Sequence, residues 1–382
     1  MLPTFRADER IRLVAAADPR LESRAQFVKD FGGRTCASVD ELCDDPEVEV
    51  IYIATPHQYH AEHCLAAARC GKHVLVEKPM AVTLADCAAM IDAARKANVR
   101  LVVGHSHSFD APYLRTRALI ESGAHGPVRM ITALNFTDFL YRPRRPEELD
   151  TAQGGGAVFN QGAHQVDVVR LLGGGRVRSI RAQTGAWDAR RPTEGAFSAL
   201  LTFENAAFAS LTYSGYAHFD SDELVGWIGE MGTAKSATTY GVTRAALRRA
   251  RTPAEEVELK RRGVYGAAPA STAPPAGHQH FGVVIASCER ADLRPLPTGV
   301  MIYGDERAWM DELPPPGVPR AEVIDELYDA IVAGQSPVHS GEWAMATLEV
   351  CRAILESARL GKELRLHHQI GVDMPVSRPS VT

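Results

Sequence analysis

The sequence predicts an α/β protein. Its first part is expected to be a parallel sheet covered by helices, and its second part an α+β domain with a large, open, mainly antiparallel sheet. In the first part, short unbroken apolar runs alternate with helical stretches, which is the pattern of βαβ units. These runs have no polar face, as in parallel strands covered on both sides. After Gly126, strand-like stretches follow one another with few long helices between them.

The elements of the first part can be assigned in chain order. We expect strands at residues 11–17, 48–56, 73–79 and 100–106. We expect helices in the intervals, at residues 21–31, 38–42, 61–72 and 84–99. Ser38 is an N-cap residue for the second of these helices, and Gly71 ends the third.

The second part is expected to contain strands at residues 128–137, 177–187, 196–205 and 206–216. One helix should follow the triple glycine at 154–156, and two more are expected at residues 320–333 and 341–360. Residues 264–280 are rich in Ala, Pro and Gly and are typical of an exposed loop. We therefore expect a cofactor domain at 1–125, a substrate and oligomerisation domain at 126–366, and a tail at 367–382.

The bulk composition excludes several classes of protein. The chain has 382 residues and a formal net charge of −5, so no basic field indicates nucleic acid or an anionic membrane. Its 7 cysteines are scattered without a CxxC pair, which favours reduced thiols over a disulfide framework. There is no signal-peptide pattern and no apolar run of the roughly 18 to 20 residues that span a membrane. We expect a cytoplasmic protein that binds neither nucleic acid nor membrane.

Asp18 ends the strand that corresponds to the second strand of a dinucleotide-binding fold. A carboxylate at this position accepts the adenosine ribose hydroxyls and repels a 2′-phosphate, which favours NAD over NADP. Arg20 weakens that preference because it can bind a phosphate. The alternative is that Asp18 and Pro19 simply form a turn after the strand, without a role in cofactor binding. The glycine loop should lie about 20 residues earlier, before Met1. The first strand and glycine loop of this Rossmann-type sheet are thus missing from the chain. We expect them to be encoded upstream and the chain to bind cofactor weakly.

Two further segments, ATPHQYH (54–60) and VEKPM (76–80), each end a predicted parallel strand. Ligands of open α/β sheets bind beyond these carboxyl ends, so both segments should face the nicotinamide. Lys78 can exchange a proton with a substrate hydroxyl there, although Glu-Lys-Pro is also a common surface turn. The predicted cofactor-binding residues are Asp18, Arg20, Ala54, Thr55, Pro56, His57, His60, Glu77 and Lys78.

The helix that follows the triple glycine carries Asn160, His164 and Asp167 at spacings of four and three residues, which places them on one face. Polar groups on the inner face of a helix need partners or a substrate. A single helical histidine is more often a structural residue, but this one lies within a polar stripe. We predict Asn160 and His164 as catalytic and substrate-binding residues.

Together these segments resemble the Gfo/Idh/MocA oxidoreductase family, from Met1 to about Leu366. The resemblance rests on IRLVAAADPR, IATPHQYH, GKHVLVEKPMA, GGGAVFNQGAHQVD and the segment GQSPVHSGEWAMATLEVCRAILESARLGK. It implies an NAD(P)-dependent dehydrogenase that acts on CH-OH or CH-CH(OH) groups and forms a homodimer or homotetramer through its open sheet. It also implies proton transfer by Lys78. The family's helical Asp and His correspond to Asn160 and His164, and because an Asn cannot act as a base, proton transfer would rest on Lys78 and His164.

Arg142, Arg144 and Arg145 lie between prolines just before this helix. Guanidinium groups bind carboxylates in a bidentate manner, so this cluster favours a dicarboxylate substrate. The alternative is a solvated loop whose charge is balanced by Glu147, Glu148 and Asp150.

Within the family the chain resembles bacterial phthalate cis-dihydrodiol (dihydroxyphthalate) dehydrogenases, in ATPHQYH, VGHSHSFDAPYLRTR, TALNFTDFLYRPRRPEELD and YSGYAHFDSDE. This resemblance implies oxidation of a phthalate cis-dihydrodiol to dihydroxyphthalate in the catabolism of aromatic compounds. The alternatives are a sugar or inositol dehydrogenase and a non-catalytic dinucleotide-binding regulator. We predict no metal, because neither His278 with His280 nor His105 with His107 has the partners of a zinc pattern.

Overall fold

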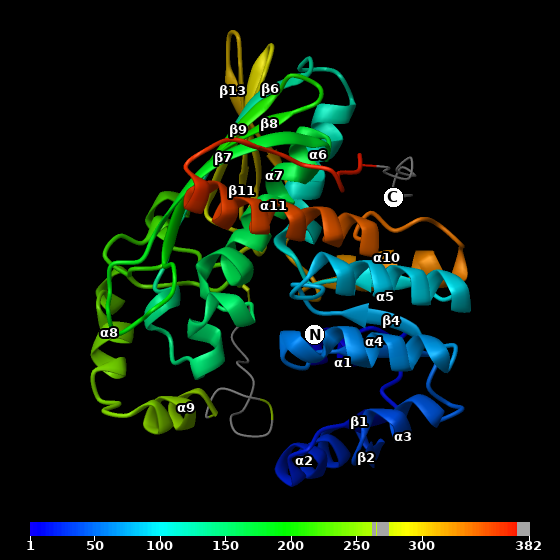
Figure 1. Cartoon of the computed structure of the whole chain (residues 1–382). Coiled ribbons are helices and arrows are strands. Elements are labelled where there is room, and N and C mark those ends of the chain that lie inside the picture. Colours follow the sequence, from blue (N-terminus) through cyan, green and yellow to red (C-terminus); the bar gives the residue numbers. More distant parts are fainter. Residues whose placement is uncertain (262–264, 266–274, 373–382) are drawn as a thin grey trace.

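The computed structural model describes residues 1–261, 265 and 275–372. It has an α/β part that contains the N-terminus and a second part built on one large sheet (Figure 1). The predicted fold class is confirmed. Most of the loop predicted at 264–280 and residues 373–382 of the predicted tail lie outside the described residues.

The parallel strands of the first part form two separate sheets. β1 (Ala15–Ala17) pairs with β2 (Arg34–Cys36), and β3 (Val50–Ile53), β4 (His73–Val76) and β5 (Leu101–Val103) pair in that order. All four predicted strands form, but each is shorter than expected. The sequence analysis did not predict β2, whose polar residues are largely exposed. A cavity of about 430 Å³ lies between the two sheets and is lined by residues of β1 and β3.

The helices of the first part are α1 (Leu2–Ala7), α2 (Leu21–Phe31), α3 (Val39–Asp44), α4 (His60–Arg69), α5 (Leu84–Ala97) and α6 (Ala111–Glu121). The predicted cap of α3 is confirmed, because Ser38 Oγ accepts a hydrogen bond of 3.2 Å from the Glu41 N–H. Gly71 follows the end of α4 with a φ of +70°, a conformation that glycine adopts without strain.

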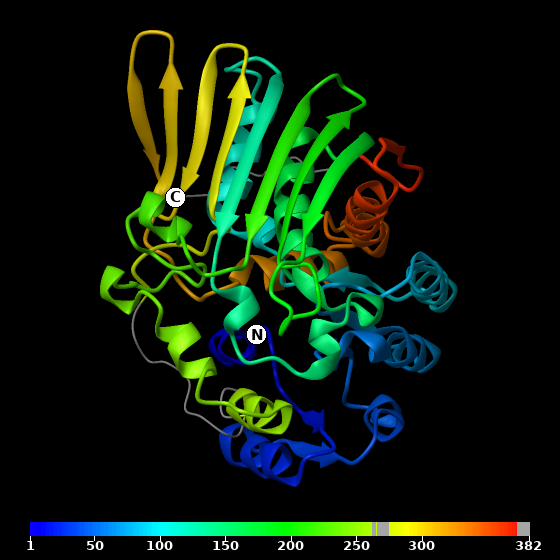
Figure 2. The ribbon, with the colours of Figure 1, turned by 60° about the vertical axis from the view of Figure 1, so that its left-hand side comes forward.

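The second part is organised by a nine-stranded sheet in the order β13-β12-β11-β10-β6-β9-β8-β7-β14 (Figure 2). Its strands are β6 (Val128–Phe136), β7 (Val177–Gly185), β8 (Ala196–Phe203), β9 (Phe208–Ser214), β10 (Val283–Cys288), β11 (Ala291–Leu296), β12 (Gly299–Gly304), β13 (Ala308–Glu312) and β14 (Leu364–Arg365). All neighbours are antiparallel except β6 and β9, which are parallel. The sequence analysis predicted β6 to β9 but none of the strands from β10 onward.

One face of this sheet is covered by α6, α7 (Ala163–Gly173) and α11 (Gly341–Leu360), which contact its strands. Exposed apolar side chains on the sheet strands include Met130, Leu200, Phe208 and Tyr303. The predicted helices at 320–333 and 341–360 are confirmed as α10 (Ala321–Val332) and α11. In the described part of the chain, no helix is both long and apolar enough to cross a membrane.

Two short helices, α8 (Val242–Leu247) and α9 (Pro253–Arg261), lie in the long connection between β9 and β10. The helix predicted after the triple glycine is not regular. A π-helical turn, Val158–Gly162, comes first and continues into α7. This turn places Asn160 at the start of α7, next to the carboxyl ends of the parallel strands.

Candidate active site

Lys78 lies two residues after the last residue of β4, at the carboxyl end of the parallel sheet. Its Nζ donates a hydrogen bond of 2.6 Å to the backbone carbonyl of Asn160. Burial lowers the pKa of Lys78 to about 8. The negative charge of Glu77 opposes this shift, and the positive charge of Arg144 adds to it. The neutral amine is therefore populated near neutral pH and can accept a proton.

The Asn160 side chain has a supporting position. Its Nδ2 donates to the carbonyl oxygens of Gly156, at 2.9 Å, and Gly154, at 3.3 Å. These bonds fix the glycine turn to the start of the helix. Asn160 thus contacts Lys78 through its backbone, and its amide nitrogen is occupied by the turn.

His164 lies in the buried space next to this turn. Its ring centroid is 4.7 Å from that of His107 and 5.3 Å from that of Phe281. Its Nδ1 has no hydrogen-bond partner among the described residues. Burial and the nearby charge of Lys78 hold the pKa of His164 well below its usual value. His164 is therefore a neutral imidazole with a free ring nitrogen close to Lys78.

Asp167 does not join His164 and Asn160, although the sequence placed the three on one face. Its Oδ1 accepts hydrogen bonds from Trp343 Nε1, at 2.6 Å, and Thr347 Oγ1, at 2.8 Å, both on α11. Its Oδ2 accepts from Ser108. The predicted polar stripe therefore divides, and Asp167 ties α7 to α11.

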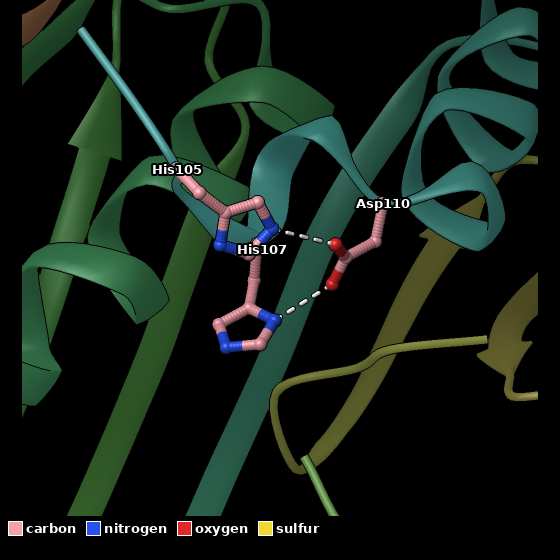
Figure 3. A group of neighbouring side chains, drawn as sticks. All are labelled: His105, His107 and Asp110. Carbon is pink, nitrogen blue, oxygen red and sulfur yellow. Dashed lines mark hydrogen bonds and ion pairs between the residues drawn. The ribbon is translucent and has the colours of Figure 1, made fainter. Parts of the chain in front are cut away.

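A third strand end contributes residues that the sequence analysis did not assign to the site. After β5, His105 and His107 both lie against Asp110 (Figure 3). His107 in turn contacts His164. The signal was present in the sequence, because VGHSHSFD (103–110) follows a parallel strand just as ATPHQYH and VEKPM do.

The predicted adenosine-binding residues are already paired with each other. Asp18 Oδ1 accepts from the Arg20 backbone N–H at 2.8 Å, and Asp18 Oδ2 accepts from Arg20 Nη2 at 2.8 Å. Asp18 also lines the cavity between β1 and β3, together with Ala54. A partly exposed carboxylate at the end of β1 can accept hydrogen bonds from ribose hydroxyls. A ribose bound there would displace the Arg20 guanidinium from Asp18, whereas a 2′-phosphate on the ribose would pair with that guanidinium.

The other predicted cofactor residues lie at the ends of β3 and β4. Ala54, Thr55, Pro56 and His57 are partly or fully exposed there. Burial and Lys78 lower the pKa of His57 to about 3. His60 differs, because its ring nitrogens lie 3.0 Å from the Pro79 carbonyl and 2.8 Å from the Thr55 carbonyl, which joins the two strand ends. Glu77 accepts a hydrogen bond from the Tyr52 hydroxyl.

The three arginines of the predicted substrate loop have different surroundings. Arg142 Nε donates to Asp138 at 2.7 Å, and its Nη2 lies 3.7 Å from Glu230. The Arg144 side chain is 11% exposed, and its guanidinium lies 3.8 Å above the Phe139 ring. Arg145 is 38% exposed and pairs with two glutamates of its own loop. The surroundings of Arg145 are those of a solvated loop, whereas Arg144 is desolvated near Lys78.

Two family descriptions match the chain. Residues 1–105 match an oxidoreductase family with an NAD-binding Rossmann fold, and residues 113–235 match the GFO/IDH/MocA C-terminal domain. The chain is 48% identical to the 1-carboxy-3-chloro-3,4-dihydroxycyclohexa-1,5-diene dehydrogenase of Comamonas testosteroni. The 363 aligned residues cover 94% of this chain and 91% of the relative.

Solved structures have the same fold. A protein from Bordetella bronchiseptica RB50 superposes with a TM-score of 0.90 at 42% identity, covering 96% of both chains. A dehydrogenase from Bordetella pertussis, solved with NADH and UDP-GlcNAcA, superposes with a TM-score of 0.64 at 21% identity, covering 94% of this chain and 91% of that one. At that identity the likeness extends to the fold alone.

The parallel βαβ units and the lysine at a strand end define a dinucleotide-dependent oxidoreductase. The chain belongs to the Gfo/Idh/MocA oxidoreductase family, and its first part is an NAD-binding Rossmann domain.

Proposed function

We propose that this chain is a dehydrogenase of carboxylated cyclohexadiene cis-diols, with phthalate cis-dihydrodiol as the specific substrate. The name of the Comamonas testosteroni relative supports a ring diol that carries a carboxylate. The observation that carries the proposal is the position of Lys78, a lysine of lowered pKa at a strand end, near the desolvated Arg144.

The site's residues have complementary parts in this reaction. NAD supplies the hydride acceptor when it is bound. The neutral Lys78 amine takes the proton from the substrate hydroxyl, while the carbon that bears this hydroxyl loses a hydride. The neutral His164 imidazole can hydrogen-bond the same oxygen. The ketone that forms tautomerises to an aromatic catechol, which makes the reverse reaction unfavourable.

Arg144 is the best placed of the three arginines to bind a ring carboxylate. Its charge influences Lys78. Its guanidinium donates to the Phe139 carbonyl at 2.9 Å, while the carboxylate oxygen nearest the guanidinium, Glu148 Oε1, is 3.8 Å away, longer than a hydrogen bond. Burial lowers the pKa of Arg144 to about 10. A substrate carboxylate would stabilise this desolvated cation more strongly than a solvated one.

The test compares Arg144→Ala with the matched control Arg145→Ala. We expect Arg144→Ala to lose about 2–5 kcal/mol in kcat/KM for phthalate cis-dihydrodiol. Arg145→Ala should lose less than about 1 kcal/mol, because Arg145 is largely solvated. A cis-dihydrodiol without carboxylates should be nearly indifferent to both changes. Equal, small losses on both substrates would contradict the proposal and favour the sugar or inositol dehydrogenase reading.

The same proposal includes NAD as the preferred cofactor, on the basis of Asp18, and a homodimer or homotetramer in the cytoplasm. Kinetics with NAD⁺ and NADP⁺ test the cofactor preference, and sedimentation of the purified protein tests the oligomeric state. The domain limits of 1–125, 126–366 and 367–382 also stay predictions, although the backbone N–H groups of His367 and His368 are already bound to Glu349.

A further inference from the structure

A cavity of about 820 Å³ lies in the second part of the molecule. Its walls come from three separate segments of the chain: residues 141–150, 188–192 and 244–256. The candidate catalytic residues Lys78, Asn160 and His164 do not line it. Its volume is in the range of about 300–1,000 Å³ that is usual for small-molecule sites.

Positive charge prevails in the lining of this cavity. Six arginines line it but only three carboxylates, those of Asp150, Asp188 and Glu256. Asp150 is engaged by two hydrogen bonds within its own turn, from the Ala152 N–H at 2.9 Å and from Gln153 at 2.8 Å. The lining therefore carries an excess of cations, and its carboxylates do not neutralise them.

The other two carboxylates are also engaged. Glu256 Oε1 accepts hydrogen bonds from Arg191 Nη1, at 2.7 Å, and from the Arg144 backbone N–H, at 2.6 Å. Asp188 Oδ2 accepts from the Tyr141 hydroxyl at 2.7 Å. These contacts tie the three wall segments together, and they account for one of the six guanidinium groups, that of Arg191.

Three arginines of the lining have no acidic partner. In the described part of the chain, no carboxylate oxygen lies within 4.0 Å of a guanidinium nitrogen of Arg244, Arg248 or Arg251. Their spacings of four and three residues place them on one side of α8 and the turn that follows it. Arg249, on another side, does not line the cavity. Like charges gathered on one side repel each other unless an anion compensates them.

Arg244 shows most directly that a ligand group is unmet. Its guanidinium lies 3.7 Å above the Tyr141 ring, and its Nη2 donates to the Tyr216 carbonyl. Its Nε is buried and has no hydrogen-bond partner among the described residues. Such a donor is costly to bury unless it finds an acceptor.

Apolar groups form the rest of the lining, among them Pro146, Leu149, Pro192 and Leu247. They give the cavity surfaces that a hydrated inorganic ion does not need but that the body of an organic ligand can contact. The combination of free guanidinium groups with apolar walls thus favours an organic anion.

We propose that this cavity is a second ligand site, which binds a small organic polyanion with two or more acidic groups on a compact body. Guanidinium groups bind both carboxylates and phosphates through paired N–H donors, so these two kinds of acidic group share the required chemistry. Arg244, Arg248 and Arg251 are the residues that would hold them.

Arg144 connects this cavity with the reaction, because it also lines the cavity and its charge influences Lys78. A polyanion in the cavity would compete with a ring carboxylate of the substrate for the Arg144 guanidinium. This part of the inference rests on the proposed function. It predicts that the polyanion raises KM for a carboxylated cis-diol.

Binding is measured by calorimetry on the full chain, with benzene-1,3,5-tricarboxylate and glucose 1,6-bisphosphate as the two polyanions. We expect at least one of them to bind about tenfold or more tightly than benzoate, since each further exposed ion pair contributes up to about fivefold. The tighter of the two identifies the preferred acidic group. Its affinity should fall as NaCl is added, because salt screens exposed charges.

The decisive variant carries Arg248→Gln and Arg251→Gln together. Both side chains are exposed, so we expect the far-UV circular dichroism of the wild type, with polyanion binding weakened about tenfold or more. The matched control carries Arg249→Gln and Arg261→Gln, which remove two exposed charges outside the cavity. Because salt screens distant charges, the control should stay within about twofold of the wild type.

Three results would overturn the site: no polyanion binding tighter than that of benzoate, equal affinity in the wild type and the decisive variant, or an equal loss in the control. Each would show that the arginines form a solvated basic surface.

Steady-state kinetics separates this inference from the proposed function. A KM for the carboxylated cis-diol that rises with polyanion in the wild type, but not in the decisive variant, supports the competition at Arg144. Polyanion binding with an unchanged KM would refute that competition and leave the cavity site and the proposed function standing. Polyanion binding by a protein that oxidises no carboxylated cis-diol would refute the proposed function and leave the cavity site standing.

Discussion

Lys78 lies at the end of a buried strand, and its surroundings rather than its type make it a base. Burial lowers its pKa to about 8, whereas Lys72, at the opposite end of the same strand, donates to the Asp45 carbonyl near the surface. The two lysines flank β4, and Lys78 is the one whose pKa burial lowers at the carboxyl end of the sheet.

This difference predicts a pH dependence. The base must be unprotonated, so kcat/KM for diol oxidation should rise with pH through an apparent pKa near 8 and level off above it. Lys78→Met should remove this rise and lower kcat by about 10²–10⁴-fold. Lys72→Met is the control and should retain the wild-type profile. Initial rates across the pH range measure both variants, and a Lys78→Met enzyme with wild-type kcat would exclude the assigned role.

At the scale of elements, the glycine turn before α7 positions Asn160 and so the contact with Lys78. Gly156 has a φ of +84°, and a Cβ atom there would lie 2.1 Å from Glu194 Oε1. Glu194 Oε1 itself accepts a hydrogen bond from the Val158 N–H at 3.1 Å. A side chain at position 156 would therefore displace the group that starts the helix.

Gly156→Ala should consequently destabilise the protein more than Gly123→Ala, which has a similar positive φ of +69° but no atom within 4 Å of its Cβ position. The control isolates the backbone cost of about 1–2 kcal/mol. Gly156→Ala should cost about 2 kcal/mol more than that, in the range of other steric insertions. Denaturant unfolding gives both values, and equal losses would show that Glu194 moves aside without cost.

At the scale of the whole molecule, a late helix completes an early core. Leu327 on α10 is 3% exposed and belongs to one apolar cluster with Phe5, Leu75 and Val102. We propose that α10 folds together with the N-terminal part, although more than two hundred residues separate it from β5 in the chain.

Leu327→Ala should therefore destabilise the N-terminal part by about 2–5 kcal/mol, the usual cost of truncating a buried leucine. Val332→Ala, at a position 64% exposed on the same helix, is the control and should change stability by less than about 0.5 kcal/mol. Urea unfolding followed by circular dichroism measures the loss. The shift of the unfolding transition on adding NAD⁺, compared between wild type and variant, then shows whether the cofactor domain is the part affected. An unaffected cofactor domain would contradict the proposal that α10 folds with the N-terminal part.

Local patterns determined much of this protein from the sequence. The βαβ rhythm, the Ser38 cap and the strand ends at 54–60 and 76–80 were readable because strand and helix periodicities are short-range. The same strand-end rule predicts Lys78 as a residue of the site.

Only the tertiary structure decided which polar groups meet. Asp167 shares a helix with His164 but binds Trp343 and Thr347, and that choice depends on where α11 packs. His105, His107 and Asp110 became a cluster through the path of the chain after β5, where the 3-10 turn His107–Phe109 brings Asp110 back to both rings. Side-chain pairing and desolvation depend on how distant segments pack against each other. The spacing of residues in the sequence does not specify this packing.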